Sequence, residues 1–239
     1  MNIRWDQRGA GKSYSKNLTK ADMHVENFIT DVKELTNILR NWFHQDKIFL
    51  LGHSWGSALG FMAIKRHPEL YHAYIAASEI VDWRRGKMIS YDWTRTQARK
   101  ENNPEAINAL EEIYPFDPTN LTHLKVLQKW VWYYGGAVRN WDLYHTYMGY
   151  LGQGSEYYSW EDVYTWTQGL AWSQKTITAE TVKVDYNLFR DLPEVQVPVY
   201  FFVGRYDYQT PFQLKEKWVL CSHLQIHKNW HVIFLGISL

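Results

Sequence analysis

Apolar residues in the first part of the chain change between helical and strand spacing. From Val25 to Phe43 they recur every three or four positions, which predicts an amphipathic helix. Two short apolar stretches, 47–51 and 71–80, predict buried strands, and residues 2–5 resemble the end of a further strand. The first part of the chain therefore combines strands with at least one helix.

A second helix is predicted between the two apolar strands, over residues 57–64. It ends near His67, because the proline that follows disfavours helix in the residue before it. Strands and helices that alternate in this order favour right-handed crossovers and a parallel sheet covered on both faces. Residues 1–80 are therefore predicted to form the first part of an α/β core.

The pattern changes over residues 81–189, where helical spacing dominates and no strand is predicted. A polar, helix-favouring stretch covers residues 92–113, and Trp and Tyr are crowded through the whole segment. Aromatic rings of this kind either line an apolar substrate pocket or pack the helices together. Strand-favouring residues return at 197–203. We predict a helical cap inserted at 81–189, with residues 190–239 completing the core.

Composition narrows the function classes. The chain has 239 residues, 46% of them hydrophobic, and 26 Lys and Arg stand against 25 Asp and Glu, so no basic face for nucleic acid is expected. No stretch has the pattern of a signal peptide or a membrane span, and the single Cys221 cannot form an internal disulfide. We expect a cytoplasmic protein without a membrane partner, and its oligomeric state stays open.

The sequence Gly-His-Ser-Trp-Gly at 52–56 follows a predicted strand and precedes a predicted helix. This pattern in this context is typical of a nucleophile elbow, a sharp turn that presents a serine hydroxyl for attack. Gly52 and Gly56 are expected to leave room where strand and helix approach each other. Ser54 is the candidate nucleophile, and His53 is interpreted as buried packing. The alternative is an ordinary surface turn.

Serine needs a base to remove its proton, and the base needs an acid to orient it. In elbow enzymes the order along the chain is Ser, then Asp or Glu, then His. Asp207 follows the last predicted strand and would lie at the same sheet edge as Ser54; the alternative is an Asp that caps a turn or helix. Among the later histidines we prefer His231, which would follow a last short strand, then His227, with His223 also available.

An oxyanion hole needs two donors aimed at the developing negative charge. The backbone N–H of Trp55, the residue after the candidate nucleophile, is the first. The second ordinarily comes from a glycine-rich loop on an earlier strand, and we expect the chain to begin after that loop. This chemistry requires no metal and no organic cofactor.

Three segments, spread over nearly the whole chain, carry a specific combination of motifs. They are WDQRGAGKS at 5–13, GHSWGSALG at 52–60 and VPVYFFVGRYDYQTP at 197–211. Together they resemble proline iminopeptidase-type α/β-hydrolases (prolyl aminopeptidase, peptidase family S33). The resemblance implies the α/β-hydrolase fold, a mostly parallel sheet flanked by helices with an inserted helical cap. It also implies N-terminal strands and an HGGPG-like segment, which we expect to be missing, and a histidine motif that residues 229–232 match only loosely.

The resemblance implies a serine hydrolase that releases N-terminal proline from small peptides through an acyl-enzyme. Ser54 would attack, His231 relay the proton, Asp207 orient the imidazole, and the Trp55 N–H stabilise the oxyanion. Substrate-binding residues are unassigned, because residues 164–174 do not reproduce the pattern typical of proline-releasing enzymes.

Two alternatives stay open. One is an esterase or amidase acting on small apolar acyl substrates. The other is a catalytically silent hydrolase fragment that acts at most as a binding module. Haloalkane or epoxide chemistry is disfavoured, because it would need a carboxylate in place of Ser54.

Overall fold

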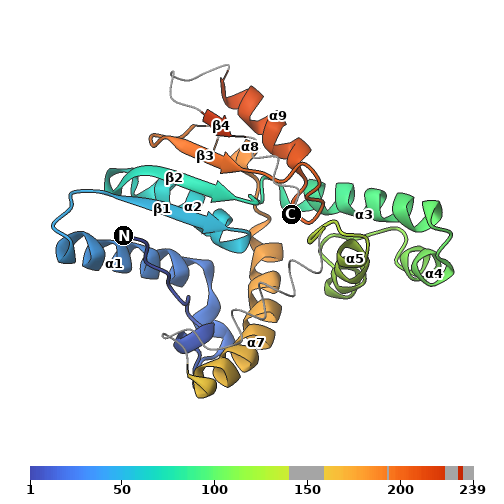
Figure 1. The fold of residues 1–239 in the computed structure, drawn as a ribbon, viewed down its shortest axis with the longest axis horizontal. Helices are drawn as coiled ribbons and strands as arrows, with labels where there is room; N and C mark the ends of the chain where they lie inside the picture. Colours follow the sequence, from blue (N-terminus) through green and yellow to red (C-terminus); the bar gives the residue numbers. More distant parts are fainter. Residues whose placement is uncertain (140–158, 193, 224–230, 234–239) are drawn as a thin grey trace.

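The computed structural model describes residues 1–139, 159–192, 194–223 and 231–233 and contains one parallel sheet (Figure 1). Its strands are β1 (Ile48–His53), β2 (Tyr71–Ala77), β3 (Val199–Phe202) and β4 (His231–Ile233). They lie side by side in the order β1-β2-β3-β4, and each neighbouring pair is parallel. The predicted α/β-hydrolase architecture, a parallel sheet flanked by helices, is confirmed.

Two predicted strands differ clearly from the structure. Residues 2–5 form no strand, and the first regular element is the short helix η1 (Gly11–Ser13). The strand predicted over 71–80 ends at Ala77, because Ser78 adopts a left-handed φ of 48° and its N–H donates to the carbonyl of Phe202 at 3.0 Å. This turn directs the chain out of the sheet.

Helices α1 (Val25–Trp42), α2 (Trp55–Arg66) and α9 (Phe212–His223) pack beside the sheet. Phe61 of α2 lies at the centre of this core, with its ring 5.0 Å from that of Tyr74 in β2 and 5.7 Å from that of Trp218 in α9. Such edge-on ring contacts add to the stability gained from burial alone. They fix the helix that follows Ser54 against the sheet.

The face of β1 that carries Phe49 and Leu51 is not covered by any other element in the described part of the chain. Side chains alternate along a strand, and Phe49 and Leu51 are 67% and 63% exposed. The expectation that helices cover both faces of the sheet is therefore wrong for this strand. β1 is also the edge strand of the described sheet, since β2 is its sheet neighbour on one side.

The segment predicted as one cap divides into two packed groups. Helices α3 (Trp83–Lys100), α4 (Pro104–Glu112) and α5 (Leu121–Tyr133) share a hydrophobic cluster. The stretch 92–113 is thus two helices, separated where Asn102 takes a φ of 49° and Asn103 caps α4.

Helix α7 (Trp160–Val184) instead packs against the N-terminal helices η1 and η2 (Lys20–Met23) (Figure 1). Its Trp172 ring lies 6.1 Å from the ring of Tyr14, and a side chain at Gly9 would collide with it. The motif at 5–13 is therefore folded against the last part of the predicted cap.

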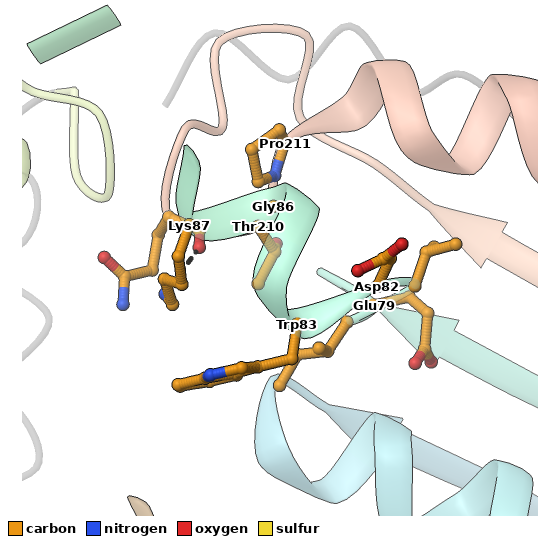
Figure 2. A pocket seen from close by; sticks show the side chains of 10 residues that line it. Glu79, Asp82, Trp83, Gly86, Lys87, Thr210 and Pro211 are labelled. Atoms are coloured by element: carbon orange, nitrogen blue, oxygen red, sulfur yellow. Dashed lines mark hydrogen bonds between the residues drawn. The ribbon is translucent and has the colours of Figure 1, made fainter. Parts of the chain in front are cut away.

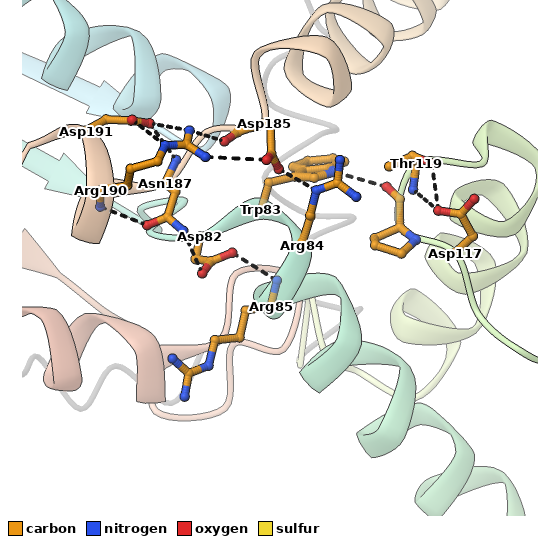
Figure 3. Close-up of polar contacts among 11 residues, drawn as sticks. Asp82, Trp83, Arg84, Arg85, Asp117, Thr119, Asp185, Asn187, Arg190 and Asp191 are labelled. Atoms are coloured by element: carbon orange, nitrogen blue, oxygen red, sulfur yellow. Dashed lines mark hydrogen bonds and ion pairs between the residues drawn. The ribbon is translucent and has the colours of Figure 1, made fainter.

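The chain enters and leaves the cap side by side, just before α8 (Leu188–Asp191), where Asp82 and Asn187 form an isolated antiparallel bridge (Figure 3). The Asn187 amide donates to Asp82 at 3.0 Å, and Asp82 also caps α3. Arg84 and Arg190 both contact Asp185, at 2.6 and 3.4 Å. These contacts join the two ends of the cap segment where they meet the core.

Candidate active site

Ser54 lies at the turn between β1 and α2 with φ 54° and ψ −120°. A non-glycine residue with positive φ is strained, and such residues cluster at functional sites. The Ser54 N–H donates to the carbonyl of Ala77 at 3.0 Å, which ties the turn to the end of β2. The side chain is half-buried. The nucleophile elbow predicted from the sequence thus has the strand, strained turn and helix that it requires.

Tyr74 explains two of the glycines around the elbow. A Cβ at Gly52 would lie 2.2 Å from the carbonyl oxygen of Gly56 and 2.6 Å from the Tyr74 hydroxyl. At Gly60 a Cβ would lie 2.4 Å from the Tyr74 ring. Gly56 itself has room, since its nearest neighbour, Nε2 of Gln7, would be 3.6 Å away. The steric expectation therefore holds for Gly52 and not for Gly56, and sequence reasoning missed Gly60.

His53 is exposed, so its interpretation as buried packing is wrong. It is the last residue of the edge strand β1, and its side chain lies on the bare face with Phe49 and Leu51.

Trp55, the candidate oxyanion donor, is the first residue of α2. Backbone N–H groups in the first turn of a helix have no partner within the helix, so this donor is available to a ligand. The indole ring packs edge-on against Phe28 of α1, with 6.0 Å between ring centroids. The helix end that carries the donor is therefore fixed by packing.

The loop at 5–13 lies beside this helix end. Arg8 makes a bidentate ion pair with Asp31 of α1, with N–O distances of 2.8 and 2.6 Å. Gly9 and Gly11 have positive φ, which explains why glycine stands at both positions. The loop thus places Gln7 near the first turn of α2.

Asp207, the candidate acid, follows β3 in a tight turn in which its N–H donates to the carbonyl of Gly204. Its carboxylate accepts from the N–H and the hydroxyl of Thr210 at 2.8 and 2.6 Å. Nζ of Lys215 lies 3.8 Å from the same carboxylate. The turn-capping contact considered as an alternative is therefore present, and it holds the carboxylate in one orientation.

The loop that carries Asp207 (residues 203–211, the acid loop) is also held by contacts from the cap. The Tyr208 ring stacks on Trp93 of α3 at a centroid distance of 4.2 Å, and the Tyr208 carbonyl accepts from Ser90 at 2.6 Å. The N–H of Tyr208 donates to Gly136 at 2.7 Å. Asp207 is thus fixed by both the core and the cap.

Ser54 and Asp207 lie at the same edge of the sheet, at the ends of β1 and β3, with β2 between them. Neighbouring strands are about 4.8 Å apart, so the two strand ends are separated by about 10 Å. A histidine ring between them would have the order of a triad.

His231 does not follow the last strand, as expected, but begins it. Its backbone pairs with Tyr200, two residues before β3 ends at Phe202. Because β3 and β4 are parallel, the His231 backbone lies toward the amino edge of the sheet, away from Asp207. The side chains of His231 and His223 are outside the description, and His227 lies outside the described residues. The base therefore stays a prediction.

Sequence reasoning missed three charged groups near this edge. Glu79 and Lys215 are 1% and 2% exposed, and Lys87 is half-buried. Burial raises the pKa of Glu79 to about 8 and lowers that of Lys87 to about 8. It also lowers the pKa of Lys215, against the attraction of Asp207. A charged residue at the end of an apolar strand, such as Glu79, was the signal available in the sequence.

A small pocket lies between α3 and the acid loop, with Glu79 and Lys87 on opposite sides (Figure 2). Lys87 donates to the carbonyl of Gln209 at 3.2 Å and sits over the Trp83 ring. Ser54 is not among the lining residues, so this pocket is separate from the elbow.

Metal ligands and membrane spans are the remaining features that bear on the class of protein. No group of three or more His, Cys, Asp or Glu side chains in the described ranges is arranged to hold a metal ion. None of the helices in the described part of the chain is both long enough and apolar enough to cross a membrane.

The chain belongs to the alpha/beta hydrolase fold family, whose model matches residues 3–234. It is 26% identical over 218 residues to the "Probable aminopeptidase YbaC" of Bacillus subtilis (strain 168), covering 90% of this chain and 67% of the relative. Its fold is similar to a proline iminopeptidase from Mycobacterium smegmatis, with a TM-score of 0.56, 18% identity and coverage of 95% and 70%. A proline iminopeptidase-related protein from Thermus thermophilus gives a TM-score of 0.51, 15% identity and coverage of 95% and 69%.

Proposed function

We propose that this alpha/beta hydrolase is a serine hydrolase of the S33 type, most like an aminopeptidase that releases N-terminal proline from small peptides. The observation that carries the proposal is the strained turn at Ser54, held between β1 and α2 and tied to the end of β2. Strain of this kind in a non-glycine residue is maintained only when the surrounding structure requires it. It raises the serine hydroxyl above the sheet edge, at the start of a helix.

In the proposed reaction the Ser54 Oγ attacks the scissile carbonyl carbon while a histidine takes its proton. The Trp55 N–H donates to the oxyanion of the tetrahedral intermediate. The C–N bond then breaks, the amine leaves with the proton from the imidazolium, and water hydrolyses the acyl-enzyme. Asp207 keeps the imidazole oriented, with its own carboxylate held by Thr210.

The base assignment is His231, with His227 as the alternative. The start of β4 at His231 counts against the first, because its backbone lies toward the edge of the sheet opposite Asp207. Variants that remove each imidazole in turn distinguish the two.

Release of N-terminal proline is supported by the three motif segments and by the similarity to the Bacillus subtilis relative that is named a probable aminopeptidase. A cytoplasmic location is proposed because the lone Cys221 requires no oxidising compartment. An esterase or amidase acting on small apolar acyl groups is the second candidate, favoured by the exposed aromatic side chains of the cap, such as Tyr133 and Tyr164.

Steady-state kinetics on proline p-nitroanilide, alanine p-nitroanilide and p-nitrophenyl butyrate separate these functions. The proposal expects kcat/KM to be highest for the prolyl substrate and lost in Ser54→Ala. Higher kcat/KM for the butyrate ester would favour the esterase. Hydrolysis that survives in Ser54→Ala would contradict both.

A further inference from the structure

Lys215, in α9, is a buried basic residue whose polar contacts reach the acid loop. Its side chain is 2% exposed, and a lysine amino group is costly to bury unless it finds hydrogen-bond partners. Nζ donates to the backbone carbonyl of Thr210, donates to the Thr210 hydroxyl at 3.1 Å and lies 3.8 Å from the Asp207 carboxylate. The buried amino group is thus satisfied by the loop that carries the candidate acid.

The Thr210 hydroxyl links this amino group to the carboxylate. A threonine hydroxyl has one proton to donate, and that of Thr210 goes to Oδ2 of Asp207 at 2.6 Å. The same oxygen accepts from Nζ of Lys215. The hydrogen bonds therefore run in one direction, from Lys215 through Thr210 to Asp207. Hydrogen bonds arranged in such a chain polarise and strengthen one another.

The backbone of Thr210 holds the other carboxylate oxygen. Its N–H donates to Oδ1 of Asp207 at 2.8 Å. One residue therefore holds both oxygens, and the contact of Lys215 with the Thr210 carbonyl fixes the backbone that carries this donor. Because each carboxylate oxygen can accept more than one hydrogen bond, Asp207 can still accept from an imidazole N–H.

Helix α9 gives Lys215 a fixed position relative to the elbow. Trp218, which is 1% exposed, lies three residues further along, and its ring is 5.7 Å from the rings of Phe61 in α2 and Phe201 in β3. Residues three positions apart are neighbours on a helix surface, so Lys215 and Trp218 share the buried face of α9. The same helix therefore packs against α2, which follows Ser54, and bonds the acid loop.

We propose that Lys215 is a positioning residue for the hydrolase reaction, which anchors the Asp207 carboxylate to α9 through Thr210. It acts through Thr210 rather than on the reacting atoms. Because Trp218 fixes α9 against α2, the anchor also sets where the carboxylate lies relative to the Ser54 turn. The inference rests on the proposed function, in which the acid must keep an imidazole oriented.

The first readout is the rate at which a fluorophosphonate labels Ser54. Lys215→Met keeps an unbranched buried chain and removes Nζ. It should slow labelling about tenfold to a hundredfold, because a misplacement of about 1 Å has an effect of this size. Thr210→Val removes the hydroxyl and should have an effect of the same order. Thr210→Ser keeps the hydroxyl and should label close to the wild-type rate.

The Asp207→Asn background separates positioning of the acid from a general loss of structure. If Lys215 acts through the Asp207 carboxylate, Lys215→Met should cause no further slowing once that carboxylate has been replaced. Three results would overturn the proposal: wild-type labelling in Lys215→Met, equal slowing by Lys215→Met in both backgrounds, or a rate in Thr210→Ser as low as in Thr210→Val.

Lys217→Met and Thr96→Val are the matched controls, since both side chains are exposed and Lys217 lies on the same helix as Lys215. Both variants should label at the wild-type rate. If Lys215→Met does not fold by circular dichroism, the comparison of Thr210→Val with Thr210→Ser carries the test.

Hydrogen exchange distinguishes failure of the anchor from failure of the proposed function. Lys215→Met and Thr210→Val should lower amide protection over residues 204–211 and leave it unchanged over residues 48–53. Wild-type Ser54 that stays unlabelled would overturn the proposed function, and hydrogen exchange would then still decide the anchor. Unchanged protection over residues 204–211 would overturn the anchor itself.

Discussion

The ring of Tyr74 occupies the space that a side chain at Gly60 would need, with Cε2 2.4 Å from the position of a Cβ. Tyr74 is fully buried, and its hydroxyl donates to the Ser57 carbonyl in the first turn of the same helix. Helix α2, which follows the candidate nucleophile, therefore packs directly against Tyr74.

Gly60→Ala should lower the free energy of unfolding by about 1–3 kcal/mol, the usual effect of overpacking a core. Gly56→Ala is the matched control, because a Cβ there meets only Gln7 at 3.6 Å and alanine favours helix. It should leave stability unchanged or raise it by up to about 1 kcal/mol. Urea unfolding followed by tryptophan fluorescence measures both, and equal effects would contradict the packing account.

The buried Glu79 should make stability depend on pH in a defined window. Its pKa is raised to about 8 in the folded protein, so the folded state binds a proton that the unfolded state releases near pH 4.5. Stability from this group is therefore present below about pH 4.5 and lost as the pH rises to about 8. Relative to Glu79→Gln, the wild type should lose on the order of a few kcal/mol across this window. Urea unfolding at pH 5, 6.5 and 8 tests the sign, and a difference that does not change with pH would contradict it.

The stack between Trp93 and Tyr208 should link the cap to the acid. Trp93→Leu removes a ring pair worth about 0.5–1.5 kcal/mol beyond its buried area. The acid loop should loosen, and fluorophosphonate labelling of Ser54 should slow although Trp93 lies in the cap. Trp42→Leu, at a ring 72% exposed, is the control and should label at the wild-type rate. Equal rates in all three proteins would show that the cap does not position Asp207.

The parts of the fold that follow local periodicity were predictable. The helix beginning at Val25, the strand before Ser54 and the Asp207 loop after β3 lie where the sequence placed them. The end of β2 was not predictable, because it depends on a hydrogen bond from Ser78 to another strand far along the chain. The packing of α7 against η1 is likewise a long-range contact that no local pattern contains.

In the candidate site, too, local motifs predicted some residues, while others depend on long-range contacts. Motifs identify Ser54 and Asp207 because their chemistry requires a fixed local turn. The burial of Glu79 and Lys215, in contrast, depends on how distant strands and helices pack together, which no local pattern contains. His231 was misplaced relative to the last strand, because strand limits near its position depend on pairing with β3.

The base is tested by removing each imidazole separately. If His231 is the base, His231→Gln should lower the rate of proline p-nitroanilide hydrolysis by about 10⁴-fold or more, as loss of a triad member does. His227→Gln should then keep the wild-type rate. The reverse pattern would assign His227, and full activity in both variants would remove both histidines from the mechanism.

The central claim is that Ser54 is an activated nucleophile oriented with Asp207. The most direct measurement is incubation of the folded protein with a fluorophosphonate, followed by peptide mass spectrometry to locate the adduct. The account predicts stoichiometric labelling at Ser54, none in Ser54→Ala, and labelling slowed at least about 10²-fold in Asp207→Asn. An intact, folded protein in which Ser54 stays unlabelled, or labels equally fast in Asp207→Asn, would contradict it.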